Sequence, residues 1–279
     1  MISDVRLSRW RAGPDTAAAI YAVKRRVGLR KKLAGLDYSR SVEYPFALAR
    51  LRLQPGQRLL EIGASKLFLA LYLAAERDVI VYATDLDPIV MVQERYAREI
   101  GRADLLDSGR LVAEVQDACQ LSYSPGYFDR VVSISTLEHI ERVEFAAAEL
   151  GRVLAPGGRA IVTVPYGKTY RVDRVKIPAY GGESDQSRTF FQHVFDRETL
   201  ERKLITPSGL FLAELAFLGE PGFRMTRLIY NRVFGRALAY ANWHWPWTAR
   251  RFYRQIAESE VTNGPENIAV LALEKREGV

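Results

Sequence analysis

The stretch LLEIGASKLFLALYLA at residues 59–74 decides the fold class of this 279-residue chain. Its first half is an apolar run typical of a buried β-strand, and its second half has the pattern of a buried helix. A strand that enters a helix through a tight glycine turn is typical of nucleotide-binding α/β proteins. Such turns usually hold two or three glycines, whereas Gly63 stands alone here, followed by Ala64, Ser65 and Lys66. The stretch therefore predicts a cofactor-binding turn and raises the question of whether one glycine is sufficient.

Strand and helix patterns alternate from this stretch onward. Strands are expected over 58–63, 79–85, 110–117, 128–135 and 158–165, with helices over 66–77, 88–101 and 141–154 between them. A further helix over 196–205 and strands over 210–219 and 267–275 follow. Strands separated by helices imply right-handed crossovers and a mostly parallel sheet with helices on both faces. We predict an α/β fold with a Rossmann-like, doubly wound sheet.

Composition and spacing divide the chain into three regions. They are a basic, helical N-terminal region at 1–52, the α/β domain at 53–219 and 265–279, and an insert or subdomain at 220–264. Within the domain, the 30 residues from 166 to 195 separate two predicted elements. Ordinary connections are only a few residues long, so this segment is expected to carry function or to pack as a subdomain.

Positive charge is concentrated in two stretches. Six of the nine residues at 24–32 are basic, and residues 221–257 hold seven Arg and nine aromatic residues but no acid. Both stretches suit an anionic partner such as lipid headgroups, nucleic acid, or a phosphorylated, lipid-linked or glycan substrate. The alternatives are a solvated helix face and a subdomain with its aromatics packed inward. Nucleic acid ranks below lipid or glycan, because the chain has no appended RNA-binding motif.

The sequence also bears on the compartment. Cys119 is the single cysteine, which excludes an internal disulfide framework and fits a reducing environment. No apolar run approaches the roughly 20 residues that a membrane-spanning helix needs, and residues 1–10 lack a secretory h-region. We expect a cytoplasmic protein, with peripheral contact to a membrane surface as an option.

Polar residues follow the predicted strands at the edge where open α/β sheets bind ligands. Asp85 ends the second strand, 22 residues after Gly63, where a carboxylate can accept both ribose hydroxyls. Asp117 ends the third strand and could accept from an adenine amino group, although either carboxylate alone could equally be a surface residue. The residues expected to line a cofactor at this edge are Glu61, Gly63, Ala64, Ser65, Asp85, Leu86, Asp117, Ala118, Ser135 and Thr136.

The segments LLEIGAS, VYATDLDP, VQDACQLSYSPGYFDRVVSISTLEHI and ELGRVLAPGGRAIVTVP resemble, in order and spacing, the motifs of class I S-adenosylmethionine-dependent methyltransferases of the type 11 kind. The resemblance covers residues 40–218 and the last strand. It implies S-adenosylmethionine as cofactor and seven strands, the last of them antiparallel and inserted between strands five and six. It also implies that Gly63 faces the methionine part, Asp85 the ribose, Asp117 with Ala118 the adenine, and Ser135 the sulfonium.

The single glycine departs from the usual three-glycine pattern of that family, but we expect a working site because both strand-end carboxylates are present. A nicotinamide enzyme fits less well. Its G-x-G-x-x-G turn requires a small third residue for close packing, and Phe68 stands there.

His139, just after the fourth strand, is the candidate general base for a hydroxyl acceptor. Its alternative role is to cap or pack the following helix. Tyr44 and Tyr166 are further candidates to face the substrate, whereas His193 is expected to be structural. No Cys, His and Asp cluster has the spacing of metal ligands, so no metal is expected.

We therefore expect O-methylation of a small molecule, a lipid or a glycan. The alternatives are a binding or scaffold module without turnover, and an RNA methyltransferase.

Overall fold

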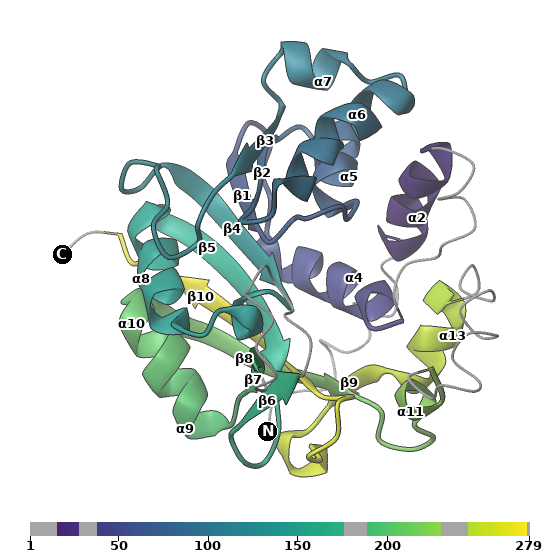
Figure 1. The fold of residues 1–279 in the computed structure, drawn as a ribbon, viewed down its shortest axis with the longest axis vertical. Coiled ribbons are helices and arrows are strands. Elements are labelled where there is room, and N and C mark those ends of the chain that lie inside the picture. The colour runs from purple at the N-terminus through teal and green to yellow at the C-terminus, as the bar shows by residue number, and fades with distance from the viewer. Residues whose placement is uncertain (1–15, 28–37, 176–188, 230–244, 278–279) are drawn as a thin grey trace.

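The computed structural model describes residues 16–27, 38–175, 189–229 and 245–277 (Figure 1). Its main sheet has eight strands in the order β3-β2-β1-β4-β5-β10-β8-β9. The first five are parallel: β1 (Arg58–Ile62), β2 (Ile80–Asp85), β3 (Leu111–Val115), β4 (Phe128–Ile134) and β5 (Leu154–Pro165). β10 (Ile268–Glu274) runs antiparallel between β5 and β8 (Phe211–Gly219). The resemblance implies seven strands with the last one inserted between strands five and six, and the structure agrees, with the short β9 (Arg254–Ile256) added at one edge.

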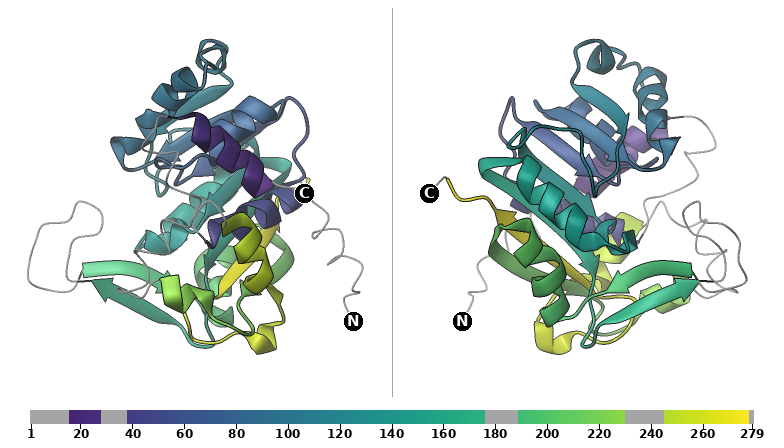
Figure 2. Two further views of the ribbon diagram at one scale, coloured as in Figure 1. Left: turned by 90° about the vertical axis from the view of Figure 1, so that its right-hand side faces the viewer. Right: turned by 60° about the vertical axis from the view of Figure 1, so that its left-hand side comes forward.

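Helices cover both faces of the sheet, as predicted (Figures 1 and 2). One face carries α2 (Thr16–Arg26), α4 (Arg40–Leu51), α5 (Leu69–Glu76) and α6 (Val92–Glu99). The other carries α8 (Val143–Val153) and the segment of α9 (Arg197–Leu200), η3 (Glu201–Ile205) and α10 (Thr206–Ser208). Neighbouring strand residues point to opposite faces, so Val131 and Val132 of β4 belong to different core clusters.

Shorter elements connect these layers. They are η1 (Pro88–Met91), α7 (Asp104–Asp107), η2 (Leu137–His139), α11 (Met225–Ile229), α13 (Trp245–Phe252) and η5 (Glu258–Glu260). The helix predicted over 88–101 is thus divided into η1 and α6. Asp87 accepts a hydrogen bond from the N–H of Ile89 and, with Pro88 beside it, begins η1 as a 3₁₀ turn.

The long segment after β5 contains a hairpin of its own. β6 (Arg171–Val175) pairs antiparallel with β7 (Thr189–Val194), and the pair stands out from the main sheet (Figure 2). Residues of β7 pack against η2 at the end of β4. The described residues of this segment thus form a hairpin that lies next to the predicted site, and whether the segment carries function stays a prediction.

The two basic stretches fall partly outside the described residues. Of the first, the structure describes 24–27, and of the second, 221–229 and 245–257. Lys24 is buried, with Nζ 5.7 Å from the centre of the Phe68 ring. Contact with an anionic partner therefore stays a prediction, as does the division into three regions. Among the described residues, no helix is both long and apolar enough to cross a bilayer.

Candidate cofactor and acceptor site

The turn after β1 requires glycine at position 63 for two reasons. Gly63 has a φ of +83°, a conformation that L-residues rarely adopt. A Cβ on Gly63 would also lie 2.2 Å from both Cγ2 and Oγ1 of Thr136. The N–H groups of Gly63 and Ala64 both donate to the carbonyl of Thr84, at 2.8 and 2.9 Å. The single glycine thus occupies the position where the turn meets the end of β4.

Gln93 holds the rest of this turn from α6. Its side-chain amide is buried and donates to the carbonyls of Ser65 and Leu67, at 3.1 and 2.7 Å. Ser65 itself has a φ of +45°, an unfavourable conformation for a residue with a side chain, and these bonds help to maintain it. Lys66 is exposed. Gln93 could not be identified from the sequence, because nothing local to α6 relates it to a turn 28 residues earlier.

Asp85 lies at the carboxyl end of β2, beside the glycine turn. Its Oδ1 accepts a hydrogen bond from the N–H of Asp87 at 2.9 Å. Burial raises the pKa of Asp85 above its ordinary value, and the N–H groups of Asp87 and Ser65 act in the opposite direction. Leu86 follows it with 65% of its surface exposed. The second strand therefore ends in a half-buried carboxylate next to an exposed apolar side chain.

Asp117 follows β3 and is exposed. Its Oδ1 accepts the N–H of Cys119 at 2.8 Å, so the carboxylate stabilises its own turn. Ala118 is partly buried against the core. Both residues lie at the strand end where the sequence predicts them, and their role toward an adenine stays a prediction.

The end of β4 is held in an unusual conformation. Ser135 has a φ of +43°, and its N–H donates to the carbonyl and to Oγ1 of Thr163 on β5, at 3.0 and 2.9 Å. Its hydroxyl donates to Oε2 of Glu43 at 3.1 Å. Such strain concentrates at functional sites when the surroundings can maintain it.

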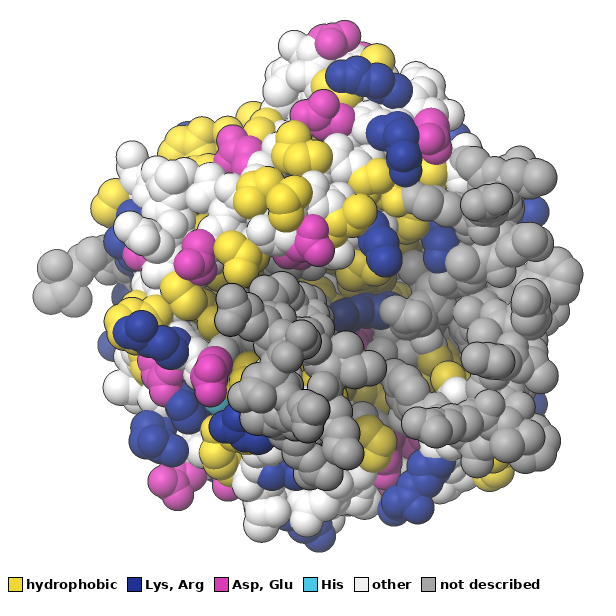
Figure 3. All heavy atoms as spheres, viewed as in Figure 1, with side chains coloured by type: hydrophobic (Ala, Val, Ile, Leu, Met, Phe, Trp, Pro, Cys, Tyr) yellow, Lys and Arg dark blue, Asp and Glu magenta, His cyan; other side chains and the backbone are white. Residues whose placement is uncertain are grey.

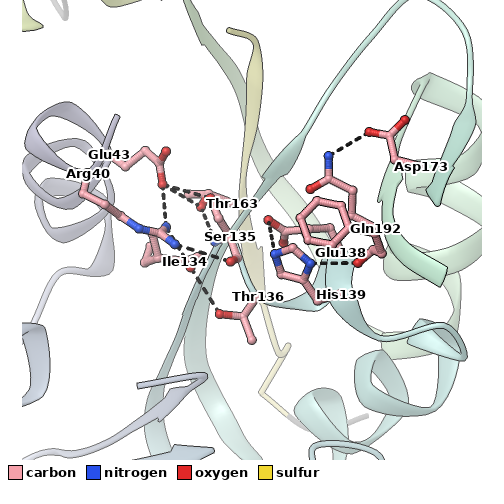
Figure 4. A network of polar contacts seen from close by, with 11 residues as sticks. Arg40, Glu43, Ile134, Ser135, Thr136, Glu138, His139, Thr163, Asp173 and Gln192 are labelled. Carbon is pink, nitrogen blue, oxygen red and sulfur yellow. Dashed lines mark hydrogen bonds and ion pairs between the residues drawn. The ribbon is translucent and has the colours of Figure 1, made fainter. Parts of the chain in front are cut away.

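Arg40 and Glu43 of α4 supply those surroundings (Figure 4). Glu43 is fully buried and accepts from Nη1 of Arg40 at 2.9 Å. The guanidinium also donates to the carbonyl of Ile134 at 2.8 Å and to that of Ser135 at 3.4 Å. We call Arg40, Glu43 and Ser135 the α4–β4 clasp. Sequence reasoning missed the clasp, although an Arg and a Glu three positions apart in SRSVEYPF were the available signal.

Replacing Arg40 with Leu is expected to lower the free energy of unfolding by about 3 kcal/mol, because Glu43 would remain buried without its cationic partner. The measurement is urea unfolding at neutral pH. The double variant Arg40→Leu/Glu43→Gln should recover part of the loss, since it removes the uncompensated charge. Equal stability of Arg40→Leu and the wild type would contradict the clasp.

His139 lies on η2, immediately beyond this region. Its Nδ1 is 2.9 Å from the carbonyl of Phe191 on β7, so in the neutral ring Nδ1 carries the hydrogen and Nε2 the lone pair. Burial lowers the pKa of His139 below its ordinary value, and Arg40 adds to this effect. The imidazole is therefore neutral at pH 7 and oriented as a weak base.

Two carboxyl groups at the ends of β1 and β4 are buried, and one of them lies beside His139. Glu138 and Glu61 are 2% and 3% exposed, and Oε2 of each has no hydrogen-bond partner among the described residues. Burial raises the pKa of both to about 8, although Arg40 lowers each. Oε1 of Glu138 lies 3.8 Å from Nε2 of His139.

The tyrosine candidates are both buried. Tyr44 lies on α4 in the core, with Arg40 over its ring at 5.9 Å. Tyr166 packs against Phe217 and donates its hydroxyl to Glu258 at 2.7 Å. Neither contact supports a role toward the acceptor, so those roles stay predictions without structural support.

His193 has structural contacts. Its Nδ1 lies 2.9 Å from the Tyr170 hydroxyl, and its Nε2 lies 3.2 Å from the carbonyls of Ile140 and Glu141. Burial lowers its pKa below the ordinary value. These contacts tie the hairpin to the segment after η2, in agreement with the structural role expected from the sequence.

The molecular surface is hollowed near the centre of this face, in the region of α4 (Figures 1 and 3). Basic and hydrophobic side chains are visible at the wall of the hollow. Within the described residues, no group of three or more His, Cys, Asp or Glu could hold a metal ion.

Comparison with known proteins agrees with this geometry. A methyltransferase-domain family model matches residues 60–162, which contain the glycine turn, Asp85, Asp117 and His139. The ubiquinone/menaquinone biosynthesis C-methyltransferase UbiE of Bordetella parapertussis is 33% identical over 138 residues, 48% of this chain and 49% of that protein. UbiE of Paraburkholderia xenovorans is 30% identical over 147 residues, 50% of this chain and 58% of that protein. The match therefore spans only about half of the length of these relatives.

Solved structures share the fold over most of the chain. The (4+2) cyclase SpnF is 18% identical, with a TM-score of 0.57 and 93% of both chains covered. A geranyl diphosphate C-methyltransferase from Streptomyces coelicolor, in complex with S-adenosyl-L-homocysteine, is 13% identical, with a TM-score of 0.54 and 84% and 79% of the two chains covered. Because a cyclase has the same fold, the fold alone does not identify the reaction.

Proposed function

From the premise that this chain carries a class I S-adenosylmethionine-dependent methyltransferase domain, we propose that it methylates a small molecule with an acidic hydroxyl. The acceptor is a phenol or enol, and the methyl group goes to its oxygen or to the adjacent ring carbon. When bound, S-adenosylmethionine supplies an electrophilic methyl group on a sulfonium. The UbiE relatives are named as C-methyltransferases of quinone biosynthesis, and reduced quinones are phenols.

The residues at the strand ends fit this cofactor. Gly63 presents only backbone atoms at its own position, Asp85 can accept ribose hydroxyls, and Leu86 offers an apolar surface to a base. The turn would face an amino-acid moiety rather than a pyrophosphate, so it needs fewer glycines than a dinucleotide turn. The observation that carries the proposal is the close fit of Gly63 against Thr136 beside Asp85.

The acidity of the acceptor is inferred from His139. Its Nε2 is the basic nitrogen, and its pKa lies below the ordinary value of about 6.5. Such a weak base can take the proton of a hydroxyl with a pKa near 10, as in tyrosine, far more readily than that of an alkyl alcohol. The α4–β4 clasp fixes the end of β4 and thereby the position of η2.

The test of activity uses cofactor labelled with tritium in its methyl group, with catechol and naphthoquinol as acceptor probes. We expect label in an organic-extractable product. Hydriodic acid releases a methyl group from oxygen but not from a ring carbon, so the same product identifies the acceptor atom. Cofactor binding without transfer to either probe would overturn the phenolic acceptor, and absence of cofactor binding would favour the scaffold alternative.

Replacing Asp85 with Ala is expected to weaken cofactor binding by about 1.5–3 kcal/mol, roughly 10- to 150-fold in Kd, because a hydrogen-bonding carboxylate is lost. Isothermal titration calorimetry with S-adenosylmethionine measures the change. Asp107→Ala is the matched control, since Asp107 is exposed at the end of α7. Equal loss in both variants would contradict a ribose contact.

A further inference from the structure

We propose that Glu138 is a second acid–base residue of this site and that, with Nε2 of His139, it receives the proton that the acceptor loses. The inference rests on the proposed function for its reaction. It begins from an unexplained feature: a carboxyl group that is 2% exposed, with an oxygen that has no hydrogen-bond partner among the described residues. Leaving such a group unsatisfied costs roughly 1–3 kcal/mol or more, so it is retained for a reason.

The position of Glu138 indicates that reason. Oε1 lies 3.8 Å from Nε2 of His139, which is too long for a direct hydrogen bond. The Phe191 carbonyl fixes the other side of the imidazole and keeps Nε2 as the basic nitrogen. A hydroxyl hydrogen placed near both atoms can reach either of them, and Figure 4 shows Glu138 and His139 adjacent at the end of β4.

Methyl transfer to this acceptor requires that the acceptor lose a proton. The bond from sulfur to the methyl carbon breaks with its electron pair on sulfur, and a bond from the acceptor's oxygen or carbon to that methyl carbon forms. The proton lost by the acceptor goes to Nε2 of His139. The carboxylate of Glu138 stabilises the imidazolium and can then take the proton from it, so the pair acts as one proton-holding unit.

Arg40 and Glu43 of α4 act electrostatically on this pair. Other titratable groups lie on β1 (Glu61), on the hairpin (Asp173 and His193) and on α8 (Glu144). Arg40 lowers the pKa of both members, whereas Glu43 raises that of Glu138. Glu43 already accepts hydrogen bonds from Arg40, Ser135 and Thr163. Glu138 is therefore the carboxyl group that lies beside His139.

A pH dependence follows. Burial raises the pKa of Glu138 to about 8 and lowers that of His139, so below pH 8 the imidazole can still accept a proton but Glu138 is protonated and offers no carboxylate to stabilise the imidazolium. Activity of the wild type should therefore rise with pH toward a plateau above pH 8. In Glu138→Gln only His139 must be deprotonated. The rise of activity with pH, which is the acid limb of the pH profile, should therefore move to below pH 6.5.

The first experiment measures kcat/KM for naphthoquinol from pH 5.5 to 9.5 in the wild type, Glu138→Gln and Glu141→Gln. Glu141 is exposed two residues beyond His139 and is the matched control. We expect the acid limb to shift down by more than one pH unit in Glu138→Gln alone. An unchanged limb in Glu138→Gln, or the same shift in Glu141→Gln, would overturn the proposal.

A second experiment needs no acceptor, so it separates failure of this inference from failure of the proposed function. The ring nitrogens of ¹⁵N-histidine-labelled protein are followed by NMR against pH, and the His139 signals are assigned with His139→Gln. The wild type should show two steps, one below pH 6.5 and one near pH 8, and Glu138→Gln should lose the upper one. A single step in both proteins would overturn the pair, even if methyl transfer is observed.

Discussion

Gly63→Val is expected to abolish binding of S-adenosylmethionine, with no measurable heat by calorimetry in correctly folded protein. Two effects combine: the φ of +83° is strained for any residue with a Cβ, and that Cβ would lie 2.2 Å from Thr136. To relieve this clash with Thr136, the end of β4 must move away from β1, and that movement opens the site that both strands form. Backbone strain and overpacking each cost about 1–3 kcal/mol for a single added Cβ. The β-branched side chain of valine adds further atoms and costs more.

The smaller change Gly63→Ala, compared with Gly109→Ala, separates the two effects. Gly109 has a similar φ of +69° but no atom within 4 Å of its Cβ position, so its variant should lose some stability and keep cofactor affinity. Adding Thr136→Gly to Gly63→Ala should restore part of the binding, because the clashing atoms are removed. Wild-type affinity in Gly63→Val would show that the turn does not hold the cofactor.

His139→Gln is expected to lower kcat by about 10²- to 10⁴-fold, the usual contribution of a positioned general base. Glutamine can keep a hydrogen bond to the Phe191 carbonyl, but it cannot accept a proton at neutral pH. The measurement is single-turnover methyl transfer to naphthoquinol at saturating cofactor.

Calorimetry on the same variant provides the control, since the cofactor affinity should not change. Partial rescue of His139→Ala by added imidazole would support the role of the ring as a base. A loss of less than about threefold would instead assign His139 the helix-packing role, which the sequence also allowed.

Much of the fold follows from local sequence patterns. The apolar runs at 58–63 and 128–135 predict β1 and β4 because side chains alternate between two buried faces. Asp85 could be placed at the cofactor edge because the ends of parallel strands meet there whatever the details of packing. β9 was missed, since three residues are too few to give a periodic signal.

Gly63 meets two requirements, and only one of them can be predicted from the local sequence. The sequence predicts that a tight turn needs one glycine, and the positive φ confirms it. That the same glycine makes room for Thr136 could not be predicted, because the two residues meet only when β1 pairs with β4. The second requirement adds a steric reason for glycine at this position to the conformational one.

The sequence by itself therefore determined the α/β fold, the glycine turn, the strand-end carboxylates and the position of His139. Only the tertiary structure decided what orients them. Arg40 reaches a carbonyl 94 residues away, Phe191 fixes the ring of His139 across 52 residues, and Tyr166 donates to Glu258. Local patterns encode strands and helices because these depend on neighbouring residues. The partner of a buried polar group is set by which elements pack together, and a single local pattern does not contain that information.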